Sequence, residues 1–344
     1  MGPSGQYGVE IMNEYTPTGM NLELTTCCPL RCPQCYCTLE GGKHLDFEIA
    51  KKRISEACDL GVKQIHMSGG ETMCYPHLYS LISFAKKNGA IVNVALSGYK
   101  FDQSAYEKIV SSGVDGIFIS LNGSTKEINE KTRDGFDLAI QALTLLKNNG
   151  FNKTYINWVM HSYNSSDFSN VLNLAEKFNV AGVVVLAFKP DSEKHLDSFP
   201  SKEQIYFLAD CIRNHKGNVK IGVESCFSQL LAVVKQTKLF GNLNTGEYKG
   251  CRAGMYNFSI NVDGDFSPCR HIDCYEKFDS LESYWNNSKV LNEIRNAESK
   301  KKEPCLSCIY TNNCRHCLAV NYKLFNGIYI GNTTCPVYKA QNNM

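Results

Sequence analysis

Residues 19–37 read GMNLELTTCCPLRCPQCYC, an apolar β-type run that leads into a dense group of cysteines. Cys28, Cys32 and Cys35 follow a C-x3-C-x2-C pattern, which puts three thiols on one tight loop. A cubane iron–sulfur cluster normally takes four cysteine ligands. Three thiolates on one loop therefore predict a cluster with one open iron, to which a small molecule can bind.

A structural zinc site is the alternative interpretation of this loop, because C-x2-C pairs are common in zinc proteins. Such a site needs a fourth ligand, and Cys27 or Cys37 is available for that role. The C-x3-C-x2-C register is complete without either of them, and a position after the first strand of a βα barrel suits an open cluster. We therefore favour an iron–sulfur cluster and expect Cys27 and Cys37 to be non-ligands.

The region around this loop alternates short β-branched or apolar runs with longer helical patterns, which is typical of repeated βα units and a parallel sheet. Six strands are expected, at residues 20–25, 62–67, 91–96, 116–121, 155–161 and 182–188. The fold class is therefore α/β, with a partial (βα)6 TIM-like barrel. Ligands of parallel sheets bind at the carboxyl ends of the strands, which is where the cysteine loop begins.

The pattern changes after Pro190. The next expected elements are a helix at 202–213, a strand near 219–223, a helix at 227–239 and a Gly- and Asn-rich loop at 241–250. Beyond them, Asp263–Gly264 favours a tight hairpin turn between β-type runs, and a helix is expected at 280–297. We divide the chain into an N-terminal extension at 1–18, the barrel at 19–190, a bridging region at 191–250 and a cysteine-rich domain at 251–344.

The composition bounds the function. Lys and Arg number 36 and Asp and Glu 34, a net charge of +2 without a long run of one sign, so we expect no nucleic acid and no membrane as partner. The apolar runs are too short to span a bilayer, and the N-terminus lacks the features of a signal peptide, which predicts a cytoplasmic protein. Seventeen cysteines, an odd number, favour metal ligation over a disulfide framework.

Two further segments lie where strands are expected to end. Ser68, Gly69, Gly70 and Glu71 follow the second strand, and Ser120 to Gly123 follow the fourth, with Arg133 downstream. Together with the cysteine loop, these segments resemble the radical S-adenosylmethionine (SAM) superfamily. The resemblance implies that the open iron chelates the methionine part of SAM, and that one electron cleaves SAM to a 5′-deoxyadenosyl radical.

The same resemblance suggests a role for each of these residues. The turn formed by Ser68, Gly69, Gly70 and Glu71 would meet the SAM amino group, Ser120 the ribose and Arg133 the carboxylate. The chain departs from the family at two positions: Gln34 replaces the usual aromatic residue before the third cysteine, and Asn122 replaces an aspartate. We therefore expect adenine packing to rely on Tyr36, and we keep Asn122 among the cofactor contacts.

The C-terminal cysteines have their own spacing. Cys251 is followed by twelve residues and Gly264, then by Cys269, Cys305-x2-Cys308-x5-Cys314-x2-Cys317 and Cys335. This order closely resembles the SPASM domain of peptide and sulfatase maturases, with a zinc ribbon as the alternative. The resemblance implies two auxiliary clusters. Cluster I would be held by Cys251, Cys269 and Cys317, and cluster II by Cys305, Cys308, Cys314 and Cys335.

The cysteine spacing does not identify the fourth ligand of cluster I. Cys226 is the nearest candidate upstream, and the alternatives are that it is a packing thiol or that the cluster has an open iron. His316 lies between two expected ligands, and we predict that it is a surface residue rather than a ligand. Cys74 and Cys274 are unassigned, with a hydrogen-atom donor to the substrate as one role for either.

The resemblance favours a peptide-modifying radical SAM oxidoreductase with three [4Fe–4S] clusters and SAM as cofactors. Such a maturase abstracts a hydrogen atom from a ribosomally made precursor, and the product is crosslinked (for example by a thioether), oxidised or epimerised. Its expected partners are the precursor peptide and an external electron donor such as flavodoxin or ferredoxin, and leader binding would need a separate leader-binding protein or a different surface of this chain. The alternatives are a SPASM oxidoreductase that acts on a small molecule or activates a sulfatase, and a non-catalytic zinc-binding interaction protein.

Overall fold

The computed structural model describes residues 15–37, 39, 41–190, 193–234, 250–312 and 314–339. Within these residues one nine-stranded sheet has the order β7-β6-β5-β4-β3-β2-β1-β8-β9. The pairs from β7 to β8 are parallel, and only β8 and β9 are antiparallel. The strands are β1 (Gly19–Glu23), β2 (Gln64–Ser68), β3 (Ile91–Leu96), β4 (Gly116–Ser120), β5 (Thr154–Met160), β6 (Gly182–Ala187), β7 (Lys220–Val223), β8 (Asn257–Ile260) and β9 (Phe266–Ser267).

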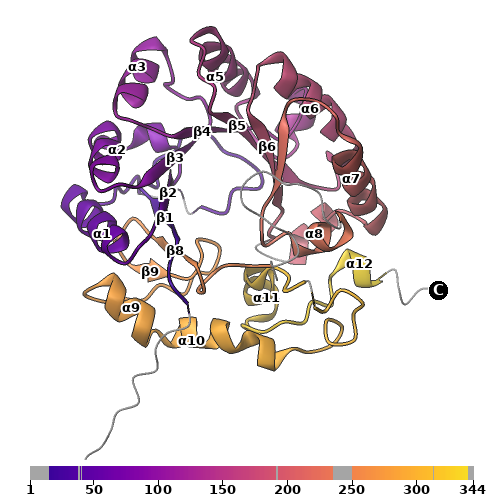
Figure 1. Cartoon of the computed structure of the whole chain (residues 1–344). Helices are drawn as coiled ribbons and strands as arrows, with labels where there is room; N and C mark the ends of the chain where they lie inside the picture. The colour runs from indigo at the N-terminus through magenta and orange to yellow at the C-terminus, as the bar shows by residue number, and fades with distance from the viewer. Residues whose placement is uncertain are drawn as a thin grey trace, which may run out of the picture.

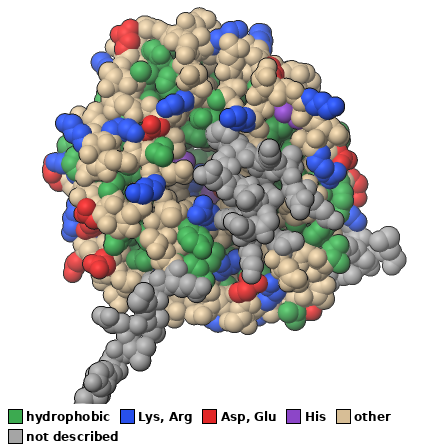
Figure 2. Space-filling model, in the orientation of Figure 1, with side chains coloured by type: hydrophobic (Ala, Val, Ile, Leu, Met, Phe, Trp, Pro, Cys, Tyr) green, Lys and Arg blue, Asp and Glu red, His purple; other side chains and the backbone are tan. Residues whose placement is uncertain are grey.

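Helices surround this curved sheet (Figure 1). The barrel helices are α1 (Phe47–Asp59), α2 (Leu78–Lys87), α3 (Gln103–Ser111), α4 (Lys126–Glu130), α5 (Phe136–Asn148), α6 (Phe168–Lys177), α7 (Lys202–Asn214) and α8 (Ser228–Val234). The C-terminal part adds α9 (Leu281–Asn287), α10 (Lys289–Arg295), α11 (Leu318–Phe325) and α12 (Pro336–Lys339). Short 3-10 turns are η1 (Thr72–Cys74), η2 (Ser165–Asp167), η3 (Glu193–Ser198) and η4 (Asn296–Lys300). None of the helices among the described residues has the length and apolarity needed to cross a membrane. Basic and acidic side chains are interspersed over the face of the molecule seen in Figure 2.

The side-chain alternation of the strands separates the core from the cavity. In β5, every second residue from Thr154 to Met160 is buried, and Ile156, Trp158 and Met160 belong to the core cluster shared with the helices. The intervening Asn157 and Val159 line a cavity on the other face of the sheet. The sheet therefore has one face packed against helices and one face turned to a functional cavity.

The α/β fold and the six expected strands are confirmed, with shifts of one or two residues at most of their ends. Two strands that sequence reasoning left outside the barrel belong to its sheet. β7 pairs with β6, and β8 pairs in parallel with β1, with Gly19 opposite Asn257. A Cβ atom on Gly19 would lie 2.7 Å from Oδ1 of Asn257, so glycine allows this approach. The C-terminal hairpin thus continues the barrel.

Two of the predicted helices do not extend over their full predicted ranges in the described residues. The single helix expected at 280–297 is wrong, because Ser288 has extended backbone (φ −64°, ψ 126°) and its Oγ accepts a hydrogen bond from Leu291 N at 3.0 Å. Ser288 therefore ends α9 and caps α10. Of the helix expected at 227–239, α8 accounts for Ser228–Val234, and the remainder lies outside the described residues, as does most of the loop at 241–250.

Candidate functional site

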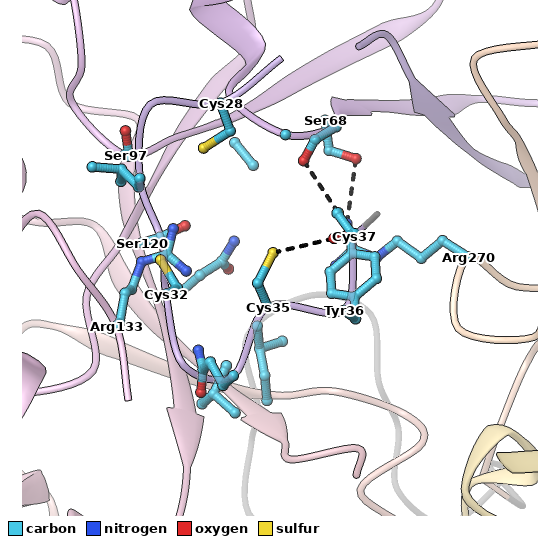
Figure 3. A pocket seen from close by; sticks show the side chains of 18 of the residues that line it. Cys28, Cys32, Cys35, Tyr36, Cys37, Ser68, Ser97, Ser120, Arg133 and Arg270 are labelled. Carbon is cyan, nitrogen blue, oxygen red and sulfur yellow. Dashed lines mark hydrogen bonds between the residues drawn. The ribbon is translucent and has the colours of Figure 1, made fainter. Parts of the chain in front are cut away.

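One cavity of about 160 Å³ lies at the carboxyl ends of the strands, between the cysteine loop and the C-terminal domain (Figure 3). Cys28, Cys32 and Cys35 point into it from the loop after β1. The other walls come from β2 to β7 or the residues that directly follow these strands, and from Arg270 and His271 of the C-terminal domain. The lining residues predicted from the sequence are Cys28, Cys32, Cys35, Tyr36, Ser68, Gly69, Gly70, Glu71, Ser120 and Arg133.

Two of the three loop thiols have shifted pKa values, in opposite directions. Burial raises the pKa of the Cys28 thiol. A side-chain hydrogen bond with Cys37, helped by Arg133 and Arg31, lowers the pKa of Cys35 to about 6. Among the described residues, no three His, Cys, Asp or Glu side chains are arranged to hold a single metal ion. A cubane makes a different demand, because each of its thiolates binds a different iron.

Glycine is required where the turn after β2 meets the loop. Gly69 has a φ of +145°, and a Cβ atom there would lie 2.5 Å from the carbonyl oxygen of Thr25. Gly70 N donates to that same carbonyl at 2.6 Å, and Glu71 N donates to the carbonyl of Cys27 at 2.8 Å. The two backbones are therefore held at a distance that only glycine permits.

The Glu71 carboxylate is already engaged. It accepts hydrogen bonds from Ser97 N at 2.9 Å and Met73 N at 3.1 Å, and also from the Ser97 hydroxyl. Burial raises its pKa, and these hydrogen bonds oppose that shift. Its side chain therefore fixes the ends of β2 and β3 together, which leaves the backbone of the turn to contact a ligand.

Arg133 has a buried side-chain nitrogen without a hydrogen-bond partner among the described residues. It lines the cavity near Ser120, which ends β4 (Figure 3). The unpartnered nitrogen is Nε. A buried guanidinium nitrogen without an acceptor is costly. The arrangement suits a ligand that brings an anionic oxygen, such as the carboxylate of SAM.

Asn122 is not among the residues that line the cavity, contrary to the expectation from its sequence position. It is buried, its amide donates to Thr132 Oγ1 at 2.9 Å, and its carbonyl accepts from Val159 N at 3.0 Å. Its own backbone carbonyl accepts from Trp158 Nε1 at 3.1 Å. Asn122 therefore joins β4 to β5, and its side-chain amide is hydrogen-bonded within the protein.

Tyr36 connects the cysteine loop to the C-terminal domain. Its ring centroid lies 4.2 Å from that of His271, and the Arg270 guanidinium lies 5.1 Å from it. Arg270 also donates to Ser68 Oγ at 3.3 Å, so one side chain contacts both the loop and the turn after β2 (Figure 3). Tyr36 lines the cavity as expected, but much of its ring is covered by these two residues.

Among the cavity residues that sequence reasoning missed are the charged Lys189, Glu224 and Arg270, and His271. Lys189 Nζ donates to Glu224 at 2.7 Å, and Ala187 N donates to the same carboxylate at 3.2 Å. Burial disfavours the charged form of Glu224, but Lys189 holds its pKa below the usual value. Both residues follow strand ends, which is the signal that could have identified them.

A second group of cysteines lies beside this ion pair. Cys226, Cys251 and Cys317 are buried, with Cys269 packed against them. The Cys226 and Cys317 thiols are hydrogen-bonded, and the Cys269 thiol interacts electrostatically with Cys251 and Cys317. The structure therefore brings Cys226 together with the three cysteines expected at auxiliary cluster I.

A third group surrounds a smaller cavity of about 30 Å³, which is lined by Cys305, Cys308, Cys314 and Cys335. His316 also lines it, but the expected surface position is wrong, since only 1% of this residue is exposed. Its Nδ1 contacts the carbonyl of Cys317 at 2.9 Å, and its Nε2 accepts from Gly331 N at 3.2 Å. Both ring nitrogens are thus used within the protein.

These features match two family models. Residues 22–175 match the radical SAM superfamily, and residues 251–309 match SPASM, an iron–sulfur cluster-binding domain. The chain therefore contains a radical SAM domain followed by a SPASM domain.

The curated relatives are more distant. The chain is 26% identical over 312 residues to the PqqA peptide cyclase of Granulibacter bethesdensis, covering 85% of this chain and 79% of the relative. It is 25% identical over 330 residues to the mycofactocin maturase MftC of Mycobacterium tuberculosis, covering 91% and 80%.

Solved structures share the fold. Streptococcus suis SuiB bound to the precursor peptide SuiA superposes with a TM-score of 0.74 at 17% identity, over 93% of this chain and 76% of that one. The native anSMEcpe enzyme with AdoMet and the Cp18Cys peptide gives a TM-score of 0.72 at 15% identity, over 94% and 95%.

The residues present fit an iron–sulfur cluster and SAM. Three thiols converge on one side of the cavity, the unpartnered Arg133 Nε lies close to them, and the Gly69–Gly70 turn leaves its backbone bare. Sulfur ligands, an arginine for a carboxylate and a side-chain-free turn together form the donor set that such a pair of cofactors needs.

Proposed function

We propose that this chain is a peptide maturase. The proposed reaction removes a hydrogen atom from a residue of a ribosomally made precursor and leads to a crosslink such as a thioether, an oxidation or an epimerisation. We place the reaction among the oxidoreductases, since the substrate carbon is oxidised when its hydrogen atom is lost. The PqqA peptide cyclase and the mycofactocin maturase among its relatives support a peptide as the substrate class.

The cysteine loop would bind the iron–sulfur cluster, and the residues at the strand ends would bind SAM. In this proposal Cys28, Cys32 and Cys35 hold a [4Fe–4S] cluster, and the turn at Gly69–Gly70 receives the SAM amino group. Arg133 binds the SAM carboxylate and Ser120 the ribose. Cluster and SAM, when bound, supply the 5′-deoxyadenosyl radical, and the protein's task is to position it and to exclude water.

The observation that carries the proposal is the composition of the cavity. The residues proposed to bind SAM share this cavity with Lys189 and Glu224, which follow β6 and β7, and with Arg270 and His271 of the C-terminal domain, beside the cysteines of the SPASM domain. A substrate in this cavity would therefore lie between the radical and the auxiliary clusters. A second cavity of about 180 Å³ shares Tyr36, Phe188 and Lys189 with the first, which provides room for a chain rather than for one small molecule.

We assign two further [4Fe–4S] clusters to the C-terminal cysteines, for a total of three. Cys226, Cys251, Cys269 and Cys317 would complete auxiliary cluster I, and the packing of these four thiols supports full ligation. Cys305, Cys308, Cys314 and Cys335 would hold auxiliary cluster II around the cavity that they line. A fully ligated cluster can pass electrons but cannot bind a substrate thiolate.

The proposed partners follow from the chemistry. Reductive cleavage needs a one-electron donor such as flavodoxin or ferredoxin, and we place the enzyme in the cytoplasm, where thiols are kept reduced. A separate leader-binding protein would deliver the precursor.

The test is to incubate the reduced holoenzyme and SAM with short peptides encoded next to its gene, with intact-mass and tandem mass spectrometry as the readout. A mass change in one peptide that requires SAM and comes with 5′-deoxyadenosine supports the proposal. A SAM-dependent change in a small metabolite while all peptides remain unmodified would instead favour the small-molecule alternative.

A further inference from the structure

Cys27 and Cys74, which no cluster assignment uses, lie together outside the main cavity. Cys27 directly precedes Cys28, and Cys74 is the last residue of η1. Their side chains are within hydrogen-bonding contact of each other. Neither residue lines the main cavity, so a role for Cys74 as a hydrogen-atom donor to the substrate is not supported.

The backbone holds the two residues in this position. Glu71 N donates to the carbonyl of Cys27 at 2.8 Å, and Cys74 N donates to the carbonyl of Glu71 at 2.9 Å. A Cβ atom on Gly70 would lie only 2.6 Å from the Cys27 carbonyl oxygen. The backbone of Cys27 and the backbone of the turn after β2 therefore approach as closely as glycine permits. This contact lies next to the two cysteines in the chain.

Cys27 and Cys74 lie outside the cavity that the proposed cluster ligands line, and both are partly exposed to solvent. Cys28 lines the cavity and Cys27 does not. Both Cys27 and Cys74 are partly exposed, so a small oxidant can reach them. Formation of an intramolecular disulfide by thiol–disulfide exchange requires that the oxidant reach one thiol and that the second thiol lie in contact with the first, and both conditions are met here.

We propose that Cys27 and Cys74 form a dithiol modification site, which a low-molecular-weight disulfide such as oxidised glutathione converts to an intramolecular disulfide while the cluster stays bound. The Cys27–Cys74 S–S bond forms as both S–H bonds break. The S–S bond of the glutathione disulfide breaks, and each of its sulfur atoms takes one hydrogen. The protein loses two electrons and two protons, and two molecules of glutathione are produced.

This bond would tie the loop that carries Cys28 to the turn that carries Glu71. Because these segments form two walls of the cavity, the disulfide would fix the distance between them. The site does not depend on which substrate the enzyme modifies, so it can fail or succeed independently of the proposed function.

The experiment treats the anaerobic holoenzyme with oxidised glutathione, alkylates the remaining free thiols in denaturant, and digests with trypsin without reduction. The expected product joins peptide 1–31, which contains Cys27 and Cys28, to peptide 64–86, which contains Cys74. It should be lighter than the two peptides by two hydrogen atoms, disappear after dithiothreitol, and form while the iron content is unchanged. Cys27→Ser and Cys74→Ser should each abolish it.

Cys58 and Cys211 serve as controls, since they are also partly exposed but lie on the barrel helices α1 and α7. They should acquire glutathione as mixed disulfides and form no crosslink. The proposal is overturned if Cys27 or Cys74 carries glutathione without an intramolecular bond, or if both remain reduced when Cys58 has reacted. A crosslink that persists in Cys27→Ser would assign the bond to Cys28 and also contradict it.

Discussion

Replacement of Gly69 by Ala should damage SAM cleavage far more than it damages folding. The added Cβ atom would lie 2.5 Å from the Thr25 carbonyl oxygen, although real Cβ contacts essentially never fall under 3.0 Å. The segment before Cys28 must therefore move by about 0.5 Å or more. A misplacement of 1 Å can cost a reaction about 100-fold, so we expect SAM cleavage to fall by roughly 10-fold or more.

The matched control is Gly61→Ala. Gly61 also has a positive φ, at +91°, but a Cβ atom there meets no other atom within 4 Å. Both variants carry the backbone strain of Ala at a positive φ that L residues rarely adopt, about 1–3 kcal/mol. Only Gly69→Ala moves the cluster loop. Gly61→Ala should lose thermal stability and retain the wild-type rate of SAM cleavage for each bound cluster.

The assay measures 5′-deoxyadenosine formation by liquid chromatography on reduced, reconstituted enzyme, with iron content and melting temperature determined on the same samples. The reasoning predicts a slow Gly69→Ala enzyme that still melts close to the Gly61→Ala control. If Gly69→Ala cleaved SAM at the wild-type rate, the close approach of the two backbones would have no role in positioning the cofactors.

Three further predictions concern other residues. Arg133→Gln removes the charged partner proposed for the SAM carboxylate, an interaction worth about 1.5–3 kcal/mol, so the Kd for SAM measured by equilibrium dialysis should rise roughly 10- to 150-fold, and an unchanged Kd would remove Arg133 from the site. Cys226→Ala should lower the iron content from about twelve to about eight per chain and abolish the electron paramagnetic resonance signal of auxiliary cluster I, whereas full iron with unaltered spectra would make Cys226 a packing residue. Burial raises the pKa of Glu23 from 4.5 to about 7, so ionisation of this carboxyl costs the folded protein up to about 3 kcal/mol of stability, and that loss develops as pH rises from 4.5 to 7. Glu23→Gln should therefore raise the melting temperature at pH 8 and change it little at pH 5, and an equal effect at both pH values would refute the assignment.

The barrel was predictable because its strands are local patterns. Each β-branched run is followed by a helix and a closing glycine, so spacing alone locates the strands and the loop after β1. β7 and β8 were not assigned to the barrel because their positions depend on pairing partners far away in the chain. β8 pairs with β1 across more than two hundred residues, and no periodicity within either strand carries that information.

The site shows the same division. Cys28, Cys32, Cys35 and the glycine turn have short, specific spacings and line one cavity, while Cys305, Cys308, Cys314 and Cys335 line another. Asn122 does not line the cavity, and its position after β4 does not reveal that its amide is hydrogen-bonded to Thr132 and Val159. His316 was taken as a surface residue because burial of one histidine between two cysteines leaves no pattern in the sequence.

Lys189 and Arg270 are cavity residues that the sequence alone does not identify. Each is an ordinary cation in the sequence, and each becomes a cavity residue only when strand ends and the C-terminal domain meet. Such residues can be anticipated by the rule that strand ends carry function, but their partners cannot. The pairing of Lys189 with Glu224 requires β6 and β7 to be neighbours, which the helical region between them hides.

The central claim is that Cys28, Cys32 and Cys35 hold a cluster that cleaves SAM, and the most direct measurement is 5′-deoxyadenosine production by the reduced, reconstituted protein and by its Cys28→Ala/Cys32→Ala/Cys35→Ala variant. The wild type should form 5′-deoxyadenosine from SAM. The variant should form none, and it should retain about eight of roughly twelve irons, because the two auxiliary clusters remain. SAM cleavage by the triple variant, or a zinc content of two or three per chain without labile sulfide in the wild type, would contradict the assignment.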